Sequence, residues 1–223
     1  MAGKQLPLVL ITGVNGYIAA HTAAVFLKAG YAVRGTVRSL RQTPAVDSLV
    51  KTLKQYHDDD DRFELVEVPD ISAPGAFDRA VEGVQAVAHL ASPVSMTETD
   101  PAPMMRAAVE GTTSLLKSAQ QLARAKGNSS SNKSTSTKSP ILNSVVLMST
   151  VSAIFSPARP PHHVFTEADW NDVAEEEVQK LGKQTPGSGY AIYQASKTAA
   201  ERAFWKFEED ERPEFGMTAL CPA

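Results

Sequence analysis

The sequence predicts an α/β fold in which a doubly wound parallel sheet is covered by helices on both faces. Short, uninterrupted apolar segments such as 8–11 are typical of strands that are buried on both faces of a parallel sheet. Segments with apolar residues at helical spacing, such as 17–29, separate these strands. Because strand and helix alternate along the chain, the strands are expected to run parallel.

The first repeat shows the pattern most clearly. Leu8–Ile11 is a β-prone apolar run, the helical segment 17–29 follows it, and Gly30 is placed to end the helix. A strand is expected at 31–37, which completes a strand–helix–strand unit. The later repeats predict helices at 45–56, 76–82, 104–125 and 190–209, and strands at 63–68, 84–90, 144–148 and 217–220.

Three polar segments fall outside this alternation. Residues 127–140 are almost all Ser, Asn, Thr and Lys, so we expect a mobile surface loop within one domain that spans 1–223. The acidic run 57–61 is interpreted as a solvated loop without a metal role. His162 and His163 lie in a proline-rich segment and are interpreted as surface residues, because no third metal ligand has a suggestive spacing.

Composition narrows the class of protein. The chain has 223 residues, 43% of them hydrophobic and 21% charged, which is typical of a globular domain with one large core. A net charge of -3 without a clustered basic face argues against a nucleic-acid partner and favours a small molecule. Cys221 is the single cysteine, which excludes an intrachain disulfide, and the apolar run 6–11 is too short to span a membrane. We therefore expect a cytoplasmic protein.

A glycine-containing turn joins the first predicted strand to the first predicted helix. Gly13 suits a tight turn, Gly16 lets the backbone approach a ligand, and Ala19 lets the helix pack closely on the strands. The amino terminus of the helix then offers free N–H groups and a partial positive charge. The sequence therefore predicts a Rossmann-type site for a dinucleotide pyrophosphate, whose contacts also include Thr12, Asn15, Tyr17 and Ile18.

The residues after the second strand indicate which dinucleotide binds. Proteins that select NAD usually place a carboxylate here to accept hydrogen bonds from the ribose hydroxyls. Residues 36–41 contain no carboxylate and carry Arg38. A guanidinium can hold the 2′-phosphate and stack on the adenine, so the sequence favours NADPH.

A second candidate element lies near the other end of the chain. Tyr193 and Lys197 are four residues apart in a predicted helix, so both side chains project from one face. A tyrosine with a pKa of about 10 is a poor acid at neutral pH, and a nearby ammonium favours the phenolate. The lysine can also hydrogen-bond the nicotinamide ribose. The pair is therefore predicted to transfer a proton beside a bound cofactor.

The glycine spacing, the Tyr193–Lys197 pair and the segments 165–170 and 200–205 resemble the extended short-chain dehydrogenase/reductase family. The similarity is strongest to dihydroflavonol reductases, cinnamoyl-CoA reductases and yeast-type methylglyoxal and ketone reductases. By this resemblance Thr150 holds the substrate oxygen, with Ser149 as the second candidate and Ser152 as a weaker third. The resemblance also implies a cofactor wall formed by Asp70, Ile71, Leu90, Ala91, Ser92 and Pro222.

The resemblance implies reduction of an aldehyde or ketone to an alcohol by NADPH, with Tyr193 as the proton donor. Family members continue beyond the residue equivalent to Pro222, so we expect the C-terminal substrate domain to be largely missing. Two alternatives stay open: a truncated, non-catalytic dinucleotide-binding protein, and a nucleotide-sugar epimerase or dehydratase, which would favour an acidic residue in place of Arg38. The long helices near Met104 and Tyr190 are compatible with either a monomer or a homodimer.

Overall fold

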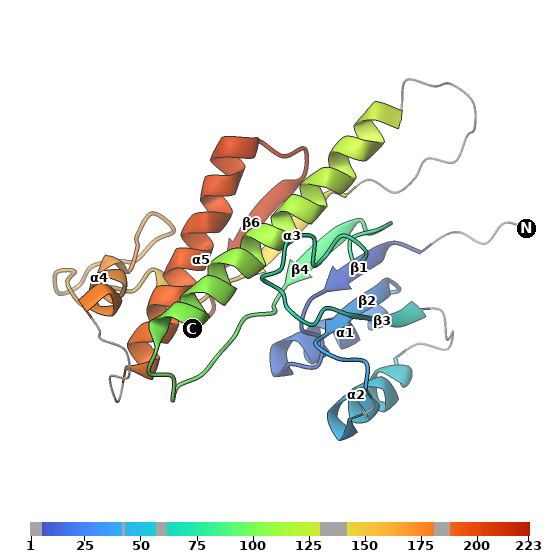
Figure 1. The fold of residues 1–223 in the computed structure, drawn as a ribbon, viewed down its shortest axis with the longest axis horizontal. Coiled ribbons are helices and arrows are strands. Elements are labelled where there is room, and N and C mark those ends of the chain that lie inside the picture. The colour runs from blue at the N-terminus through green and yellow to red at the C-terminus, as the bar shows by residue number, and fades with distance from the viewer. Residues whose placement is uncertain (1–5, 42, 57–61, 130–141, 181–187) are drawn as a thin grey trace, which may run out of the picture.

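The computed structural model describes residues 6–41, 43–56, 62–129, 142–180 and 188–223, and they form an α/β fold built on one parallel sheet (Figure 1). Its six strands follow the order β3-β2-β1-β4-β5-β6. This confirms the predicted fold class. The strands are β1 (Leu8–Ile11), β2 (Ala32–Val37), β3 (Phe63–Glu67), β4 (Ala86–His89), β5 (Ser144–Met148) and β6 (Gly216–Leu220).

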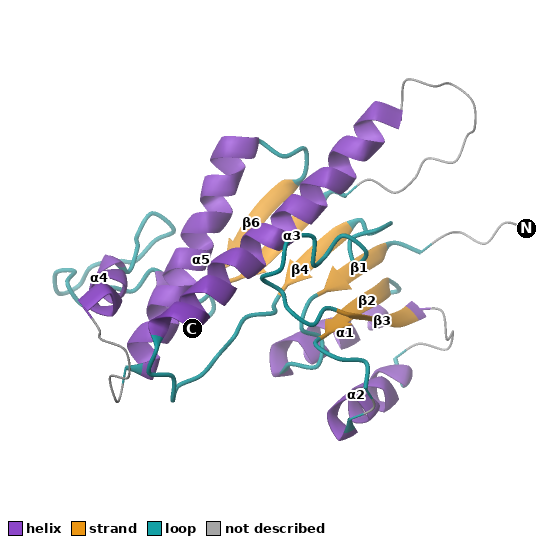
Figure 2. Ribbon diagram, viewed as in Figure 1, coloured by secondary structure: helices purple, strands orange, loops and turns teal. Residues whose placement is uncertain are grey.

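The central strand β1 shows why the sheet is covered on both faces. Leu10 packs into a cluster with residues of α3 (Pro101–Ser129) and α5 (Gly189–Glu211). Its neighbours Val9 and Ile11 point the other way, toward α1 (Tyr17–Lys28) and α2 (Pro44–Lys54). Figure 2 shows α3 and α5 lying together across one face of the sheet. A strand with two buried faces needs apolar residues at every position, as the sequence indicated.

The strand order reverses beside β1, which pairs with β2 on one side and with β4 on the other. Chain crossovers therefore leave β1 in opposite directions, and a crevice forms beyond the carboxyl ends of β1 and β4. Among the described helices, none has the length and apolar character that crossing a membrane would require.

Predicted and observed elements agree closely over most of the chain. Strands β1 and β5 have the predicted bounds, and each end of the other strands lies within two residues of its predicted place. Helix α3 is longer than predicted at both ends. Asp100 caps its start by accepting from the Ala102 N–H at 3.0 Å, and residues 127–129 of the predicted loop form its last turn. The rest of that loop and the acidic run 57–61 lie outside the described residues.

The helix predicted at 76–82 is wrong, because this segment forms successive turns. Gly75 and Gly83 both have positive φ, at 70° and 75°, which leaves only seven residues between two positions that interrupt a helix. The apolar side chains of Phe77, Ala80 and Val81 are nevertheless fully buried against the core. The apolar pattern at 76–82 therefore reflects burial in the core and not a helix.

Helix α4 (Asp172–Lys180) was not predicted, and it packs on α5 (Figure 1). Asn171 begins it, since its side-chain oxygen accepts from the Ala174 N–H at 3.2 Å and its amide donates to the Ser152 carbonyl at 3.0 Å. The same asparagine thus ties α4 to the short 3-10 helix η2 (Val151–Ala153), directly after β5. An Asn followed by acidic residues is a helix start signal that the sequence does contain.

Candidate functional site

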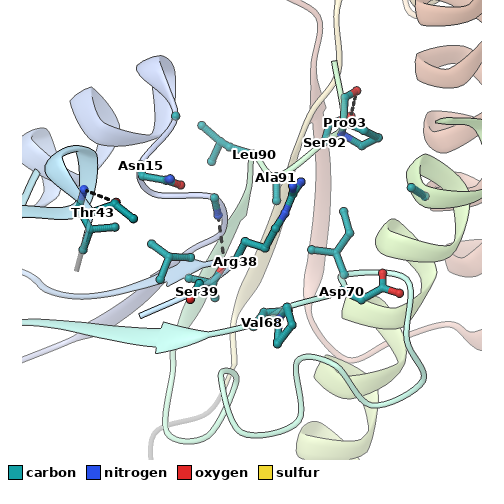
Figure 3. Close-up of a pocket in the computed structure, with 18 residues that line it drawn as sticks. Asn15, Arg38, Ser39, Thr43, Val68, Asp70, Leu90, Ala91, Ser92 and Pro93 are labelled. Carbon is teal, nitrogen blue, oxygen red and sulfur yellow. Dashed lines mark hydrogen bonds between the residues drawn. The ribbon is translucent and has the colours of Figure 1, made fainter. Parts of the chain in front are cut away.

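A cavity of about 840 Å³ opens at the carboxyl ends of β1, β2, β3 and β4 (Figure 3). It lies at the switch point of the sheet, where ligands of this fold class bind. Nine of the predicted cofactor-binding residues line it: Gly13, Asn15, Gly16, Arg38, Asp70, Ile71, Leu90, Ala91 and Ser92. The structure therefore brings the glycine turn, the residue after β2 and the segments after β3 and β4 to one place.

The glycine turn has a backbone that side chains would obstruct. Gly13 has a φ of 65°, and a Cβ at this position would lie 3.1 Å from the Ala91 Cα. Gly16 donates its N–H to the Gly13 carbonyl at 2.8 Å, and its own added Cβ would lie 3.2 Å from that oxygen. No side chain caps the start of α1. The first N–H groups of the helix are thus without a side-chain acceptor, as in helix starts that bind anions.

Thr12 holds the cavity wall together from behind. It is fully buried, and its hydroxyl oxygen accepts from the N–H groups of Leu90 at 3.0 Å and Ala91 at 2.9 Å. Because these two bonds use the oxygen as an acceptor, its hydrogen is donated to His89 Nδ1, 2.9 Å away. Burial, and to a lesser degree the charge of Lys197, lowers the pKa of His89 to about 3, so its ring is neutral.

Thr12, predicted to contact the cofactor, lies behind the cavity wall. It does not line the cavity and instead fixes the Leu90–Ala91 backbone that does. Tyr17 and Ile18, grouped with the cofactor contacts in the sequence, also lie outside the lining and are exposed on α1. Within the glycine motif, Gly13, Asn15 and Gly16 are therefore the residues that face the cavity.

Arg38 and Asp70 sit at opposite sides of the cavity mouth. The exposed Arg38 side chain extends across the cavity in the direction of Ala91 (Figure 3). Glu67, the nearest carboxylate in β3, accepts from the Leu40 N–H at 2.6 Å and is thereby turned toward the backbone. Hydrogen bonds from the Ser72 hydroxyl and N–H hold the pKa of Asp70 below its usual value. Arg38 thus presents positive charge where sequence analysis placed a 2′-phosphate.

A second, much smaller cavity lies next to the first and shares Ala91 and Ser92 with it. Ser149 and Lys197 line this cavity from the other side. The ammonium of Lys197 donates to the Met148 carbonyl at 3.3 Å, and burial lowers its pKa from the usual 10.5 to about 8. Two segments separated by more than a hundred residues of chain therefore meet at the Ala91–Ser92 wall.

The two hydroxyls that follow β5 differ in what they bond. Ser149 donates to the buried carboxylate of Glu201. Thr150 accepts weakly from the Ser152 N–H at 3.3 Å, as the cap of η2, which leaves its hydroxyl hydrogen unassigned. Ser149 is thus committed to a protein acceptor, whereas Thr150 can still donate.

Tyr193 and Pro222 line neither cavity. Tyr193 is half-buried on α5, one helical turn before Lys197, so the two share a helix face. The Pro222 carbonyl accepts from the Val151 N–H at 2.9 Å, which places the chain after β6 beside η2. His163, interpreted as a surface residue, is only partly exposed and contacts Asp169 at 2.9 Å.

Sequence reasoning missed several residues that line the large cavity. Thr36 accepts from the Gly13 N–H at 3.0 Å and so joins the glycine turn to β2. Thr43 caps α2 by accepting from the Val46 N–H at 3.3 Å, and a Thr before a Pro is a helix start signal. The other residues that were not predicted are Val37, Ser39, Val46, Val68, Pro69, Pro93 and Ala107. Val46 lies on α2 and Ala107 on α3, whereas the others end or follow strands, and none of them carries a separate sequence signal.

Fold and site together define a Rossmann-type α/β protein with a cavity at the switch point of its sheet. The family model described as GDP-mannose 4,6 dehydratase matches residues 10–138, which is more than half of the chain. The chain therefore belongs to the epimerase/dehydratase branch of the extended short-chain dehydrogenase/reductase family.

Individual relatives agree with this placement. Aldehyde reductase 2 of Sporidiobolus salmonicolor is 33% identical over 215 residues, covering 96% of this chain and 56% of the relative. An uncharacterized oxidoreductase of Schizosaccharomyces pombe is 34% identical over 226 residues, covering 100% of this chain and 58% of the relative. The solved structure of yeast methylglyoxal/isovaleraldehyde reductase with NADPH is similar with a TM-score of 0.75 at 29% identity, covering 96% of this chain and 57% of that one. The chain thus spans somewhat more than half the length of these relatives.

Proposed function

We propose that this protein binds NADPH and reduces an aldehyde or ketone to the corresponding alcohol. The observation that carries the proposal is the shared Ala91–Ser92 wall, which joins the glycine-lined cavity to the small cavity lined by Ser149 and Lys197. A single extended ligand can contact both cavities along this wall. The aldehyde reductase among the relatives, and the reductase that was solved with NADPH, support the same activity.

The residues of the large cavity fit a dinucleotide. Gly13 and Gly16 leave a hollow that a Cβ would obstruct, and the uncapped start of α1 directly follows Gly16. Arg38 supplies a guanidinium for the 2′-phosphate, and the side chain of Glu67 is turned away by its bond to Leu40. Together these residues would hold the pyrophosphate and favour NADPH over NADH.

In the proposed reaction a bound NADPH would supply the hydride that reduces the carbonyl carbon, and the residues of this chain would handle the proton. Tyr193 donates its phenolic proton to the carbonyl oxygen, which completes the alcohol. Thr150 donates a hydrogen bond to the same oxygen and stabilises the negative charge that develops there. Lys197, held by the Met148 carbonyl, keeps an ammonium on the face of α5 that carries Tyr193 and favours the phenolate left after proton transfer.

A nucleotide-sugar dehydratase or epimerase is the second candidate, because the matching family model describes GDP-mannose 4,6 dehydratase. Such enzymes keep a tightly bound NAD, for which a carboxylate after β2 is favoured. Arg38 occupies that region in this chain. Purified protein that carries NAD and needs no added NADPH would favour this second candidate.

The proposal is tested by NADPH oxidation with a panel of aldehydes and ketones, using the wild type, Tyr193→Phe and Tyr190→Phe. We expect Tyr193→Phe to lower kcat by about a thousandfold and to leave the Kd for NADPH unchanged, because it removes only the acidic proton. Tyr190, exposed on the same helix, is the matched control and should keep wild-type kcat. NADPH binding without turnover of any carbonyl compound would instead indicate a non-catalytic dinucleotide-binding protein.

A further inference from the structure

A buried carboxylate that the proposed reaction does not use lies one turn after Lys197 on α5. Glu201 is 5% exposed, and among the described residues it forms no ion pair. Three neutral groups donate to it instead: the Ser149 hydroxyl, the Trp205 indole N–H at 3.4 Å and the Cys221 thiol at 3.5 Å. Both carboxylate oxygens are engaged.

These three donors come from three different parts of the fold. Ser149 directly follows β5, Trp205 lies on α5 itself, and Cys221 directly follows β6. Burial, followed by the charge of Glu201, raises the pKa of the Cys221 thiol, so this donor keeps its proton at neutral pH. Glu201 therefore ties one helix to two adjacent strand ends.

Burying a carboxylate without a paired cation usually costs free energy of folding. Apolar side chains of similar volume are often neutral or better for stability at such positions, whereas a buried polar group can fix one arrangement of its neighbours. The arrangement fixed here is the run 148–151. The Met148 carbonyl accepts from Lys197, the Ser149 N–H donates to the Leu220 carbonyl at 2.8 Å, and the Val151 N–H donates to the Pro222 carbonyl.

We infer that Glu201 is a positioning residue for the proposed reaction: by holding the Ser149 hydroxyl and the Cys221 thiol, it fixes the end of β5. Two consequences follow for the residues around it. Ser149 has its hydrogen engaged by Glu201, so of the two hydroxyls that directly follow β5 only that of Thr150 can donate to the substrate oxygen. The Met148 carbonyl stays where it orients the Lys197 ammonium. The effect of Glu201 on catalysis rests on the proposed function, whereas its effect on the end of β5 rests on the contacts alone.

Two measurements on the full chain separate the effect on the strand end from the effect on catalysis. Amide hydrogen exchange at Ser149 and Val151 reports the order of the strand end without requiring any activity. Steady-state kinetics with NADPH and a carbonyl substrate reports kcat and KM. The variants are Glu201→Leu, which removes the acceptor, and Glu201→Gln, which keeps one acceptor oxygen. Glu208→Leu is the control, since Glu208 is exposed on the same helix.

We expect Glu201→Leu to speed exchange at these two amides by about tenfold or more, while amides of β1 and β2 keep their wild-type rates. It should lower kcat by about tenfold or more and change the KM for NADPH little, because the glycine cavity is untouched. Glu201→Gln should restore most of both losses. Ser149→Ala alone should lower kcat less than tenfold and have no further effect in the Glu201→Leu background.

Unchanged exchange at Ser149 and Val151 in both Glu201 variants would overturn the inference. The inference would also be overturned if the Glu201 variants were less stable but still bound NADPH and kept the wild-type kcat. Glu201 would then act only in the stability of the fold. A wild type that reduces no carbonyl compound overturns the proposed function instead, and in that case the exchange rates still decide whether Glu201 orders the strand end.

Discussion

The two walls of the site are built in different ways. The wall formed by the glycine turn and the ends of β2 and β4 is shaped by backbone: a positive φ at Gly13, its close approach to Ala91, and the hydroxyl of Thr12 behind them. The wall formed by β5 and α5 is shaped by side chains that meet from distant parts of the chain, such as Ser149 with Glu201.

The two walls should therefore fail in different ways. A backbone wall tolerates changes of exposed side chains and fails when a Cβ or an unpaired N–H is introduced. A side-chain wall encloses polar and charged groups, such as Lys197, in the core of the protein. Its stability therefore depends on the protonation of those groups, and it should respond to pH where the first wall does not.

Lys197→Met gives the largest expected effect and tests the side-chain wall. The pKa of Lys197 is about 8 in the folded protein and 10.5 in the unfolded chain. Between these values the unfolded chain binds more protons, so the wild-type free energy of unfolding should rise by about 3 kcal/mol as the pH increases from about 8 to about 10.5. Lys197→Met should lose this rise in urea unfolding at a series of pH values.

Lys206 is the matched control, because it lies exposed on the same helix and pairs with Asp210 at 2.9 Å. Lys206→Met should keep the wild-type rise between pH 8 and 10.5. Equal slopes for the wild type and Lys197→Met would show that the Lys197 ammonium is well hydrated, contrary to the burial of its side chain.

Gly13→Ala tests the backbone wall, with Gly83→Ala as its control. Both glycines have positive φ, at 65° and 75°, but an added Cβ meets Ala91 at position 13 and nothing within 4 Å at position 83. Each substitution should lower the free energy of unfolding by about 1–2 kcal/mol through backbone strain. Only Gly13→Ala should also weaken NADPH binding, by about a hundredfold, in a fluorescence titration. Equal affinities of the two variants for NADPH would contradict the proposal that the glycine turn holds the cofactor.

The backbone wall is also the part that the sequence predicts best. Gly13, Asn15 and Gly16 occur in one short segment between a strand and a helix, and the need for glycine there is a local property of the turn. Asp70, Ile71 and Ala91 follow strands that periodicity located, so their place at one sheet edge follows from topology. Local patterns are visible in a sequence because every residue that causes them is close by in the chain.

The side-chain wall was less predictable, because its contacts join residues far apart in the chain. Nothing in the sequence around Glu201 indicates that Ser149, 52 residues earlier, donates to it. The order of Thr150 before Ser149 as hydroxyl donor therefore came from family resemblance and not from any contact visible in the sequence. The bonds of Thr12 were unpredictable for a related reason, since they join it to His89 and to N–H groups that lie 78 and 79 residues away.

Thr12→Val should have a smaller effect, on the stability of the backbone wall. Valine has the same shape, but it leaves the partly buried N–H groups of Leu90 and Ala91 without an acceptor, so we expect a loss of about 2 kcal/mol. Thr12→Ser keeps the hydroxyl and should recover most of this loss in urea unfolding. Thr22, whose hydroxyl bonds the Ile18 carbonyl on the exposed face of α1, is the control and should change by less than about 0.5 kcal/mol as Val.

Arg38→Ala should have the smallest effect, and it tests the choice of cofactor. The guanidinium is exposed at the cavity mouth, so solvent and salt weaken its attraction for a phosphate. We expect about tenfold weaker binding of NADPH, unchanged binding of NADH, and a smaller difference at high salt. Arg41, exposed nearby but absent from the cavity lining, is the control, and Arg41→Ala should bind both cofactors as the wild type does. An equal loss of affinity for NADH and NADPH in Arg38→Ala would mean that this side chain supports the cavity without contacting the 2′-phosphate. The choice of cofactor would then have to come from the backbone wall.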